Sequence, residues 1–407
     1  MRTPTEAPQL SLTAAKHDVR TYRFITPVFG GGVNLRESDP VTPVRVASIR
    51  GQLRFWWRAV NPCGCTSVDE LRKAEEEVFG STTQASRLVV RVSKQPAKLE
   101  AMPVLQDGTP FGVGRGMDAI AYGVFPLRAT KAPFQHGKLS NFGDELFELV
   151  FSYPDAIENH VQAALWAWAH FGALGGRTRR GFGAIAQVSP ALPNIDDGWA
   201  RFVKSAPATW PHLDIKPKFA TKPTTDGRAA LALLLGALRT VRQGPGIGRR
   251  RGEGQSGPHG RSFWPEPDAI RQLFRDQVGE KHGTPVTDQN CFPRAAFGTP
   301  IIFHFKQPPR DASRDEKEYA KDPLDSTLMP KGKSRTASRL LLRPHLGASG
   351  KVEAMALVLH HPLPPSGYVL LQKDHAEVVS VDLKTPLSIG DVPFTDPIER
   401  YIKELLA

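Results

Sequence analysis

The segment between residues 172 and 183 carries the clearest chemical signal in the chain. It reads Gly-Ala-Leu-Gly-Gly-Arg-Thr-Arg-Arg-Gly-Phe-Gly, so Gly175 and Gly176 come just before Arg177, Arg179 and Arg180. Glycine lets the backbone adopt positive φ and approach a partner closely. Guanidinium groups bind phosphates through charge-assisted, often bidentate hydrogen bonds. The segment therefore predicts a cradle for the phosphates of a nucleic-acid backbone.

A nucleotide pocket is one alternative for this glycine-rich segment. Dinucleotide loops of the GxGxxG type follow a strand and open a helix, whereas a helical pattern precedes this segment and an apolar strand pattern follows it. A P-loop is excluded because no Gly-Lys-Ser or Gly-Lys-Thr ends the run. A flexible surface turn, to which glycine clusters are generally prone, stays open.

A second set of cations recurs at helical spacing. Arg50, Arg54 and Arg58 are four residues apart, so they share one face of a helix. Aligned like charges repel one another unless acidic side chains or a phosphate chain lie against them. Trp57 is a candidate for stacking on an RNA base, whereas Trp56 is expected to pack in the core.

A third basic cluster lies in the second half of the chain. Arg335, Arg339 and Arg343 are evenly spaced beside Lys331 and Lys333. If the segment is extended, even spacing places the three arginines on one face and predicts a second RNA track. A solvated sheet edge protected by positive charge stays open as the alternative.

Patterns typical of catalysis or metal binding are missing. RNA cleavage without a metal needs an acid and a base with pKa near 7, usually histidine, yet the 12 histidines form no recognisable constellation. His170 is the best placed of them, and a helix-end cation is its more ordinary role. Cys63, Cys65 and Cys291 supply neither a disulfide framework nor a zinc-ligand pattern. We expect no catalytic residue, no metal and no cofactor.

The elements that position these residues follow an orderly pattern in the first half. Strand patterns lie at 21–26, 87–92, 122–128 and 184–188, and helical patterns run from Ser48 to Pro62 and from Pro154 to Phe171. The resulting order is that of the split βαβ, or ferredoxin-like, fold, in which two helices cover a four-stranded antiparallel sheet. We therefore predict an α+β domain at 1–206, with the glycine-rich segment between its last helix and last strand.

A second, divergent domain of α+β type is predicted at 207–407. Residues 190–226 lack clear periodicity and are interpreted as a connector, with the boundary near Pro207. A mobile basic insert is expected at 243–262 and a charged loop at 306–336. The remaining expected elements are helices at 228–242, 268–274 and 397–406 and strands at 299–305, 340–342, 354–361 and 368–371.

The composition favours a polyanionic partner. The 407 residues include 53 Lys and Arg against 41 Asp and Glu, giving a formal net charge of +12 and a pI near 9.7, which indicates nucleic acid rather than a neutral small molecule. The N-terminus has no apolar signal-peptide core, and the longest apolar run, 229–238, is too short to span a bilayer. With so few cysteines, we expect a cytoplasmic protein without membrane association.

The position of the glycine-rich segment resembles that of the RAMP proteins of CRISPR systems, which carry such a loop between the last helix and last strand of a ferredoxin-like domain. More narrowly, Ile49-Arg-Gly-Gln-Leu-Arg-Phe-Trp-Trp-Arg58, Glu77-Val-Phe-Gly-Ser81 and Trp264-Pro-Glu-Pro-Asp-Ala-Ile-Arg271 resemble the RAMP subunit at the guide 3′ end of type III-B (Cmr) effector complexes. The resemblance touches both predicted domains.

The resemblance implies two ferredoxin-like domains in an antiviral ribonucleoprotein, with guide crRNA, target RNA and neighbouring RAMP subunits as partners. It also implies that the chain does not cleave RNA, and that the RNA contacts include Arg50, Arg54, Arg58, Arg177, Arg179 and Arg180. Two alternatives stay open. One is a metal-independent RAMP endoribonuclease that processes guide RNA with a His, Tyr or Lys near the glycine-rich segment. The other, a small-nucleotide binder, is disfavoured by the order of helix, loop and strand.

Overall fold

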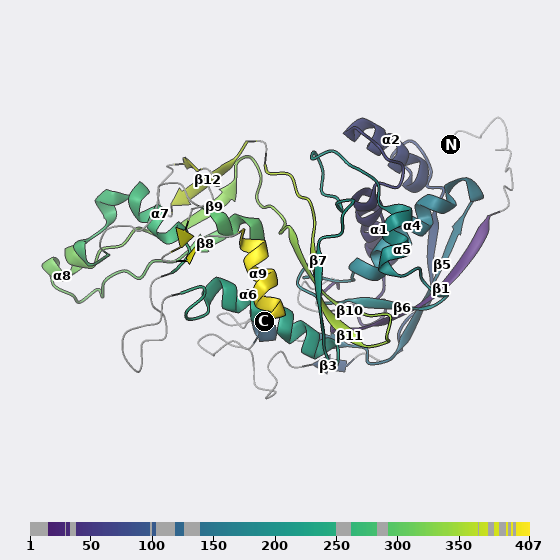
Figure 1. Ribbon diagram of the computed structural model, residues 1–407, viewed down its shortest axis with the longest axis horizontal. Coiled ribbons are helices and arrows are strands. Elements are labelled where there is room, and N and C mark those ends of the chain that lie inside the picture. The colour runs from purple at the N-terminus through teal and green to yellow at the C-terminus, as the bar shows by residue number, and fades with distance from the viewer. Residues whose placement is uncertain are drawn as a thin grey trace, which may run out of the picture.

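The computed structural model describes most of the 407 residues (Figure 1). The described ranges are 15–28, 30–32, 38–97, 100–102, 119–125, 139–249, 262–282, 292–364, 366–372, 378–381, 388–389, 392–393 and 396–407. They form two sheets with helices between and beside them, and a third sheet at one end of the molecule (Figure 1).

The first sheet has the strand order of a ferredoxin-like domain. Its central strand β1 (Lys16–Phe24) pairs antiparallel with β5 (Leu146–Tyr153) and β6 (Ile185–Ser189), and β2 (Val89–Lys94) pairs with the outer side of β5. Helices α1 (Val46–Val60) and α4 (Glu158–Phe171) pack against each other and share a core with the strands. The order β2-β5-β1-β6 confirms the predicted ferredoxin-like α+β fold of the first half.

The burial pattern explains why these segments form these elements. Along β5, buried residues such as Phe147, Leu149 and Phe151 alternate with partly exposed ones, as a strand with one covered face requires. Helix α4 is instead buried at every position from Ala163 to Phe171, because protein packs on several of its sides.

Two element predictions in the first half were wrong. The third strand was expected at 122–128, but Tyr122 and Gly123 belong to the short helix α3 (Ala119–Gly123), and β5 takes the place of that strand. Residues 126–128 lie outside the described ranges. Helix α1 begins at Val46, two residues before Ser48, with Arg45 as an extended N-cap residue.

A second antiparallel sheet, ordered β10-β11-β7, lies on the other side of the first-domain helices. It consists of β7 (Phe219–Pro223), β10 (Leu340–Leu346) and β11 (Val352–Val358). Leu341, Met355 and Leu357 on one face join the core that contains α1 and α4. Leu340, Leu342 and other residues of the opposite face join the core formed by α6 (Gly227–Gln243) and α9 (Pro397–Leu406).

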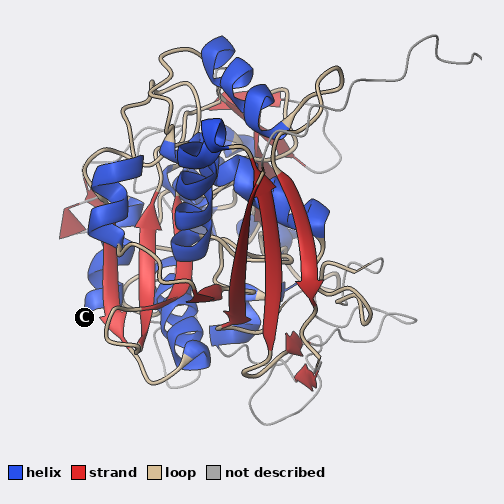
Figure 2. Cartoon of the chain, turned by 90° about the vertical axis from the view of Figure 1, so that its right-hand side faces the viewer, coloured by secondary structure: helices blue, strands red, loops and turns tan. Residues whose placement is uncertain are grey.

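The molecule is therefore layered as sheet, helices, sheet, helices, and Figure 2 shows helices between two sets of strands. In the second half, the order β7, α6, β10, β11, α9 with sheet neighbours β10-β11-β7 matches three strands and both helices of the ferredoxin-like order. Helices α6 and α9 confirm the predictions at 228–242 and 397–406.

The segment 190–226 is more than a connector. It contains β7 and helix α5 (Ile195–Phe202), which begins where the Asn194 side chain accepts a hydrogen bond from the Asp197 backbone at 2.8 Å. Trp199 of α5 packs against Trp166 of α4 and Phe219 of β7. Because the two halves share this core, the boundary near Pro207 remains a prediction.

The third sheet, ordered β13-β12-β9-β8, encloses a small core of its own at the far end from β1 and β5 (Figure 1). Its strands are β8 (Ile301–Phe303), β9 (Ser326–Pro330), β12 (Tyr368–Gln372) and β13 (Val378–Val381), and α7 (Glu266–Leu273) contributes Ala269 and Ile270 to that core.

The prediction of a structureless loop at 306–336 was wrong. That segment contains β9, in which Ser326, Leu328 and Pro330 are buried, and the helix α8 (Arg314–Tyr319). A capping box between Ser313 and Glu316 begins α8. Most of the predicted mobile insert, residues 250–261, lies outside the described ranges.

The remaining elements are short or peripheral. They are α2 (Val68–Phe79), β3 (Glu100–Met102) paired with β4 (Leu139–Asn141), β14 (Ser388–Ile389) paired with β15 (Val392–Pro393), and 3-10 turns at Asp155–Ile157, Arg275–Gln277, Glu280–His282 and Pro293–Phe297. A disulfide joins Cys63 and Cys65. No helix in the described part of the chain has the length and apolarity needed to cross a membrane.

Candidate nucleic-acid interface

The glycine-rich segment lies between α4 and β6, as predicted, and it is fixed to both halves of the protein. The Thr26 hydroxyl donates to the Gly181 carbonyl at 2.7 Å, and the Gly183 N–H donates to the Pro27 carbonyl at 2.9 Å. On the other side, the Leu342 N–H donates to the Arg179 carbonyl at 3.1 Å. The segment is therefore a brace between the two sheets and not a free surface turn.

Two of its glycines are required by packing. Gly183 has φ +65°, and an added Cβ would lie 1.9 Å from the Leu174 carbonyl oxygen. Gly181 has φ +88°, and its Cβ would lie 2.8 Å from Leu231 Cδ1 and 2.9 Å from Pro344 Cδ. These contacts explain why the end of the segment needs glycine at positions 181 and 183, with no need for a bound ligand. Gly175 and Arg177, at the tip, are the parts exposed to solvent.

Arg179 and Arg180 turn inward, toward the second half. Arg179 Nη1 donates to the Ser338 carbonyl at 2.7 Å, and its guanidinium lies 5.3 Å from the Phe55 ring centre. Arg180 Nη2 donates weakly to the Phe297 carbonyl at 3.4 Å, and its Nη1 is buried with no hydrogen-bond partner among the described residues. Burial lowers the pKa of both guanidinium groups, that of Arg180 to about 10. Arg179 and Arg180 thus help to hold the glycine-rich segment against the second half of the chain.

Arg177 and Arg335 belong to two separate clusters in the sequence but are near enough in the structure to interact electrostatically. Both side chains are exposed overall. The pKa of the Arg177 guanidinium is lowered, first by the protein around it and then by the positive charge of Arg335. Within the part of the chain that the structure describes, neither arginine forms an ion pair. The bond from Arg179 to Ser338 ties the two segments together and so positions this pair.

The third predicted cluster does not form one continuous track. Arg343 is almost fully buried, and its Nη2 donates to the carbonyls of Ala169 at 2.6 Å and Ile185 at 2.7 Å. Arg339 is half-exposed and lies 3.9 Å from Asp396. Only Arg335 of the three is freely exposed, because β10 from Leu340 onward, although it is an edge strand of its sheet, is buried.

Arg50, Arg54 and Arg58 share one side of α1, as predicted, but their guanidinium groups are bonded to other parts of the protein. Arg54 and Arg58 both pair with the buried carboxylate of Glu75 on α2. Arg50 donates to the Phe79 carbonyl at 2.7 Å and to Ser86 Oγ at 3.0 Å. The acidic neighbour that relieves repulsion along this ridge is therefore Glu75, which sequence spacing did not identify.

The stacking role predicted for Trp57 was wrong for this conformation. Trp57 is completely buried, packs edge-on against Phe79, and donates from Nε1 to His160 Nδ1 at 3.2 Å. Trp56 is buried as expected. Both indoles therefore belong to the core.

His170 is not placed for acid–base chemistry. It is buried between the His345 ring, at 3.1 Å, and the Pro193 carbonyl, at 2.9 Å. Burial lowers the pKa of His170 to about 4, so the ring is neutral at pH 7 and the helix-end cation role is also wrong. The histidine near the glycine-rich segment is instead His361, whose pKa is lowered by burial and also by Arg179.

A basic groove that sequence spacing missed lies in the second half, where the end of α6 meets α7 and β8. Its volume is about 600 Å³. Arg271 and Arg294 on its wall are compensated by Asp322 and Glu266. The uncompensated cations within the described residues share no sequence motif; they are Arg242, Arg249, Lys281 and Lys306.

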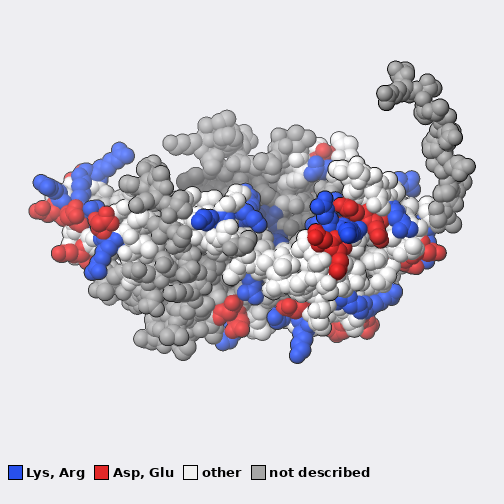
Figure 3. Space-filling view, turned by 90° about the horizontal axis from the view of Figure 1, so that it is seen from above, with Lys and Arg blue, Asp and Glu red and all other residues white. Residues whose placement is uncertain are grey.

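Cations link this groove to the glycine-rich tip. The pKa of Arg180 is lowered mainly by burial, with smaller contributions from Arg242 and Arg177. Because Arg180 turns inward, these charges interact through the protein and not along an exposed surface. Elsewhere the charge is mixed: on the face shown in Figure 3, acidic side chains stand among the lysines and arginines over the half that carries α2.

Comparisons with known proteins agree with the first-half fold. Residues 21–186 match the family model of the RAMP superfamily. The chain is 25% identical over 173 residues to CRISPR system Cmr subunit Cmr1-2 of Pyrococcus furiosus, covering 40% of this chain and 89% of that protein. It is 28% identical over 160 residues to subunit Cmr1-1 of the same organism, covering 38% of this chain and 43% of that protein.

Two solved structures align along nearly the whole chain. The apo crystal structure of Cmr1 from Pyrococcus furiosus aligns with a TM-score of 0.46 at 16% identity, covering 95% of this chain and 96% of that one. A chain of the type III-B Cmr-beta complex bound to cognate target RNA aligns with a TM-score of 0.44 at 11% identity, covering 96% and 99%. The matched family region contains both α1 and the glycine-rich segment.

Proposed function

Because residues 21–186 form a RAMP superfamily domain, we propose that this chain is an RNA-binding subunit of a type III-B CRISPR effector complex that holds RNA without cutting it. The relatives it resembles are named as Cmr subunits, which supports membership of such a complex. Its partners are then guide crRNA, target RNA and neighbouring RAMP subunits.

The observation that carries the RNA-binding part is that Arg177 and Arg335, both exposed, interact electrostatically and have no ion pair within the described residues. Two guanidinium groups held near each other without an acidic partner repel, and a phosphodiester between them relieves that repulsion with charge-assisted hydrogen bonds. The exposed backbone at Gly175 lies beside them. The basic groove, around which Lys281 and Lys306 are exposed, offers further phosphate contacts.

The groove fits a single strand better than a duplex. Phe305 on its wall is partly exposed, with the Arg271 guanidinium 5.3 Å from one face of its ring, and Lys281 and Lys306 are exposed around it. Single-strand sites combine such stacking platforms with a cationic track. An extended RNA strand satisfies both requirements.

The non-catalytic part follows from the histidines near the site. Cleavage needs a base and an acid in reach of the same ribose. His361 lies near Arg179, which disfavours its protonation, and its Nδ1 contacts the Pro362 carbonyl at 3.0 Å. His170 is buried, and its ring nitrogens contact His345 and Pro193. Among the residues that the structure describes, these two histidines do not supply such an acid–base pair, which supports a non-catalytic role.

Incubating the purified chain with labelled single-stranded RNA in EDTA at low salt tests both parts. We expect a retarded complex from which full-length RNA is recovered. Failure to bind would overturn the RNA-binding proposal. Cleavage products that disappear in His361→Ala would instead establish a metal-independent endoribonuclease.

A further inference from the structure

A cluster of three metal-ligand side chains lies where the segment after α5 meets the end of β11. His212 and His360 form an antiparallel bridge, in which each backbone N–H donates to the other's carbonyl, at 3.2 Å and 2.9 Å. Their imidazoles stack with ring centres 4.5 Å apart. Asp214 Oδ1 lies 4.0 Å from His212 Nε2, and one ligand atom from each residue lies within 4.8 Å of the others.

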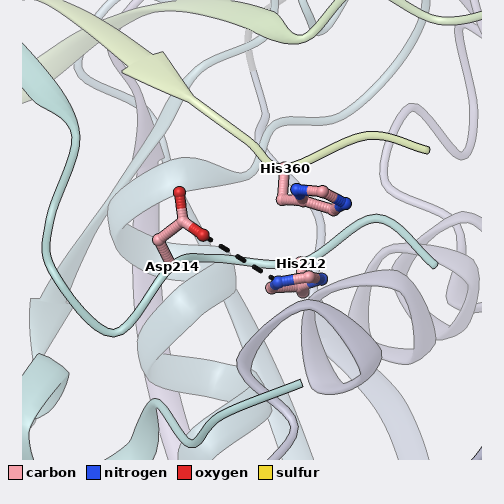
Figure 4. A group of neighbouring side chains, drawn as sticks. All are labelled: His212, Asp214 and His360. Atoms are coloured by element: carbon pink, nitrogen blue, oxygen red, sulfur yellow. Dashed lines mark ion pairs between the residues drawn. The ribbon is translucent and has the colours of Figure 1, made fainter. Parts of the chain in front are cut away.

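The hydrogen bonds of the two rings leave one nitrogen of each available. His212 Nδ1 is 2.9 Å from the Trp210 carbonyl, and His360 Nε2 is 3.3 Å from the Ala208 carbonyl. A carbonyl only accepts, so these nitrogens carry the protons, and His212 Nε2 and His360 Nδ1 keep their lone pairs. Figure 4 shows a nitrogen of each ring on the side of Asp214. In metal sites, a ligating histidine usually donates its other ring N–H to a backbone carbonyl or carboxylate, which fixes the orientation of the ring.

The local charges also suit a cation. Asp214 Oδ2 pairs with Lys218 at 2.8 Å, which leaves Oδ1 for a ligand role. Two imidazoles with one carboxylate form a donor set that Zn²⁺ accepts, with a fourth position for water.

We propose that His212, Asp214 and His360 bind a divalent transition-metal ion, with Zn²⁺ as the best match. Zinc–nitrogen and zinc–oxygen bonds are about 2.0–2.2 Å long, so ligand atoms now up to 4.8 Å apart move together by about 1 Å when the ion binds. Side-chain rotations suffice for this, because His360 and Asp214 are only partly buried. The ion fastens the segment after α5 to the end of β11.

Zinc titration of the EDTA-treated, desalted full-length protein tests this proposal. We expect one Zn²⁺ per chain in competition with a chromophoric chelator, and a rise in Tm on adding Zn²⁺. His360→Gln and Asp214→Asn should each weaken zinc binding by at least about tenfold, the lower end of what even an outer-layer change costs. His304→Ala, which removes an exposed histidine paired with Asp325 at 2.7 Å, is the matched control and should bind like the unchanged protein.

Two results would overturn the proposal. One is a Tm of the unchanged protein that Zn²⁺ does not move. The other is a zinc affinity that is equal in His360→Gln, Asp214→Asn and His304→Ala. Because neither readout uses RNA, the result is independent of the proposed RNA binding. His360 and Asp214 are chosen for substitution because the buried His212 also packs in the core, where its loss could unfold the chain.

Discussion

Arg177 at the tip of the glycine-rich segment and Arg335 from the second half lie near enough for their positive charges to repel, and neither forms an ion pair within the described residues. The fold holds them there through Arg179, which donates to Ser338, and through the Leu342 N–H, which donates to Arg179. Like charges held together by rigid backbone contacts form a site for an anion.

The double substitution Arg177→Ala/Arg335→Ala should weaken single-stranded RNA binding and flatten its salt dependence. If each arginine neutralises one phosphate, the slope of log affinity against log salt should shrink by about 1.4, at about 0.7 per contact. Fluorescence anisotropy at several salt concentrations measures this. Arg72→Ala, which removes an exposed arginine of α2, is the control and should leave the slope unchanged. An unchanged slope in the double variant would remove this pair from the interface.

The basic groove should contribute independently. Lys281→Ala/Lys306→Ala removes two exposed cations that have no acidic partner among the described residues, so RNA affinity should fall several-fold while Tm stays constant. Lys317→Ala/Lys351→Ala, at exposed positions of α8 and the β10–β11 turn, controls for net charge. Equal losses in both double variants would mean that only total charge matters.

Glu75→Gln should destabilise the first half. The substitution removes the carboxylate from Arg54 and Arg58 in a site where Glu75 is buried, which should cost about 1–3 kcal/mol of unfolding free energy. Glu76→Gln breaks an exposed pair with Arg72 and should cost less than about 0.5 kcal/mol. Urea unfolding compares the two. If both substitutions lower the unfolding free energy by a similar small amount, the Glu75 carboxylate does not stabilise Arg54 and Arg58 on α1.

Gly183→Ala should destabilise the protein by more than about 3 kcal/mol, since a Cβ meets the Leu174 carbonyl in a positive-φ conformation. Gly51→Ala on the exposed side of α1 has nothing within 4 Å and should stabilise by about 0.5–1 kcal/mol. Thermal unfolding of both variants checks the assignment. A harmless Gly183→Ala would mean that the glycine-rich segment is not the packed brace described above.

The buried pair His170 and His345 should make stability fall in mild acid. Burial lowers the pKa of His170 to about 4 and that of His345 to about 3. Both rings titrate near 6.5 when unfolded, so between about pH 6.5 and 3 the unfolded chain binds more protons and folding weakens as pH falls. Each unit of lowered pKa corresponds to about 1.4 kcal/mol. His345→Asn should show a smaller loss of Tm between pH 7.5 and 5, whereas an equal loss would contradict this origin.

Local patterns predicted most of the fold, because they depend on near neighbours in the chain. The helical spacing of Ile49, Leu53 and Trp56 located α1, and the glycine-rich run was placed correctly between α4 and β6. β5 was missed, although Phe147, Leu149 and Phe151 alternate clearly, because the apolar stretch at 122–128 was taken as that strand. β9 was missed because the charged residues before it hid a five-residue strand.

The candidate site was less predictable, because its decisive contacts are between distant parts of the sequence. Sequence spacing identified the arginines but not Glu75, which forms ion pairs with Arg54 and Arg58. It also did not identify the carbonyls of Ala169 and Ile185, which accept hydrogen bonds from the buried Arg343. It also treated Arg177 and Arg335 as members of separate clusters. Only the packing of the second sheet against the first-half helices brings them together.

Crosslinking of the full chain to single-stranded RNA, with the crosslinked peptides mapped by mass spectrometry, tests the RNA-binding site most directly. Peptides covering residues 174–183 and 331–339 should dominate, followed by those that line the basic groove. Crosslinks confined to other surfaces, such as α2 or α8, with none at either segment, would contradict the proposed site.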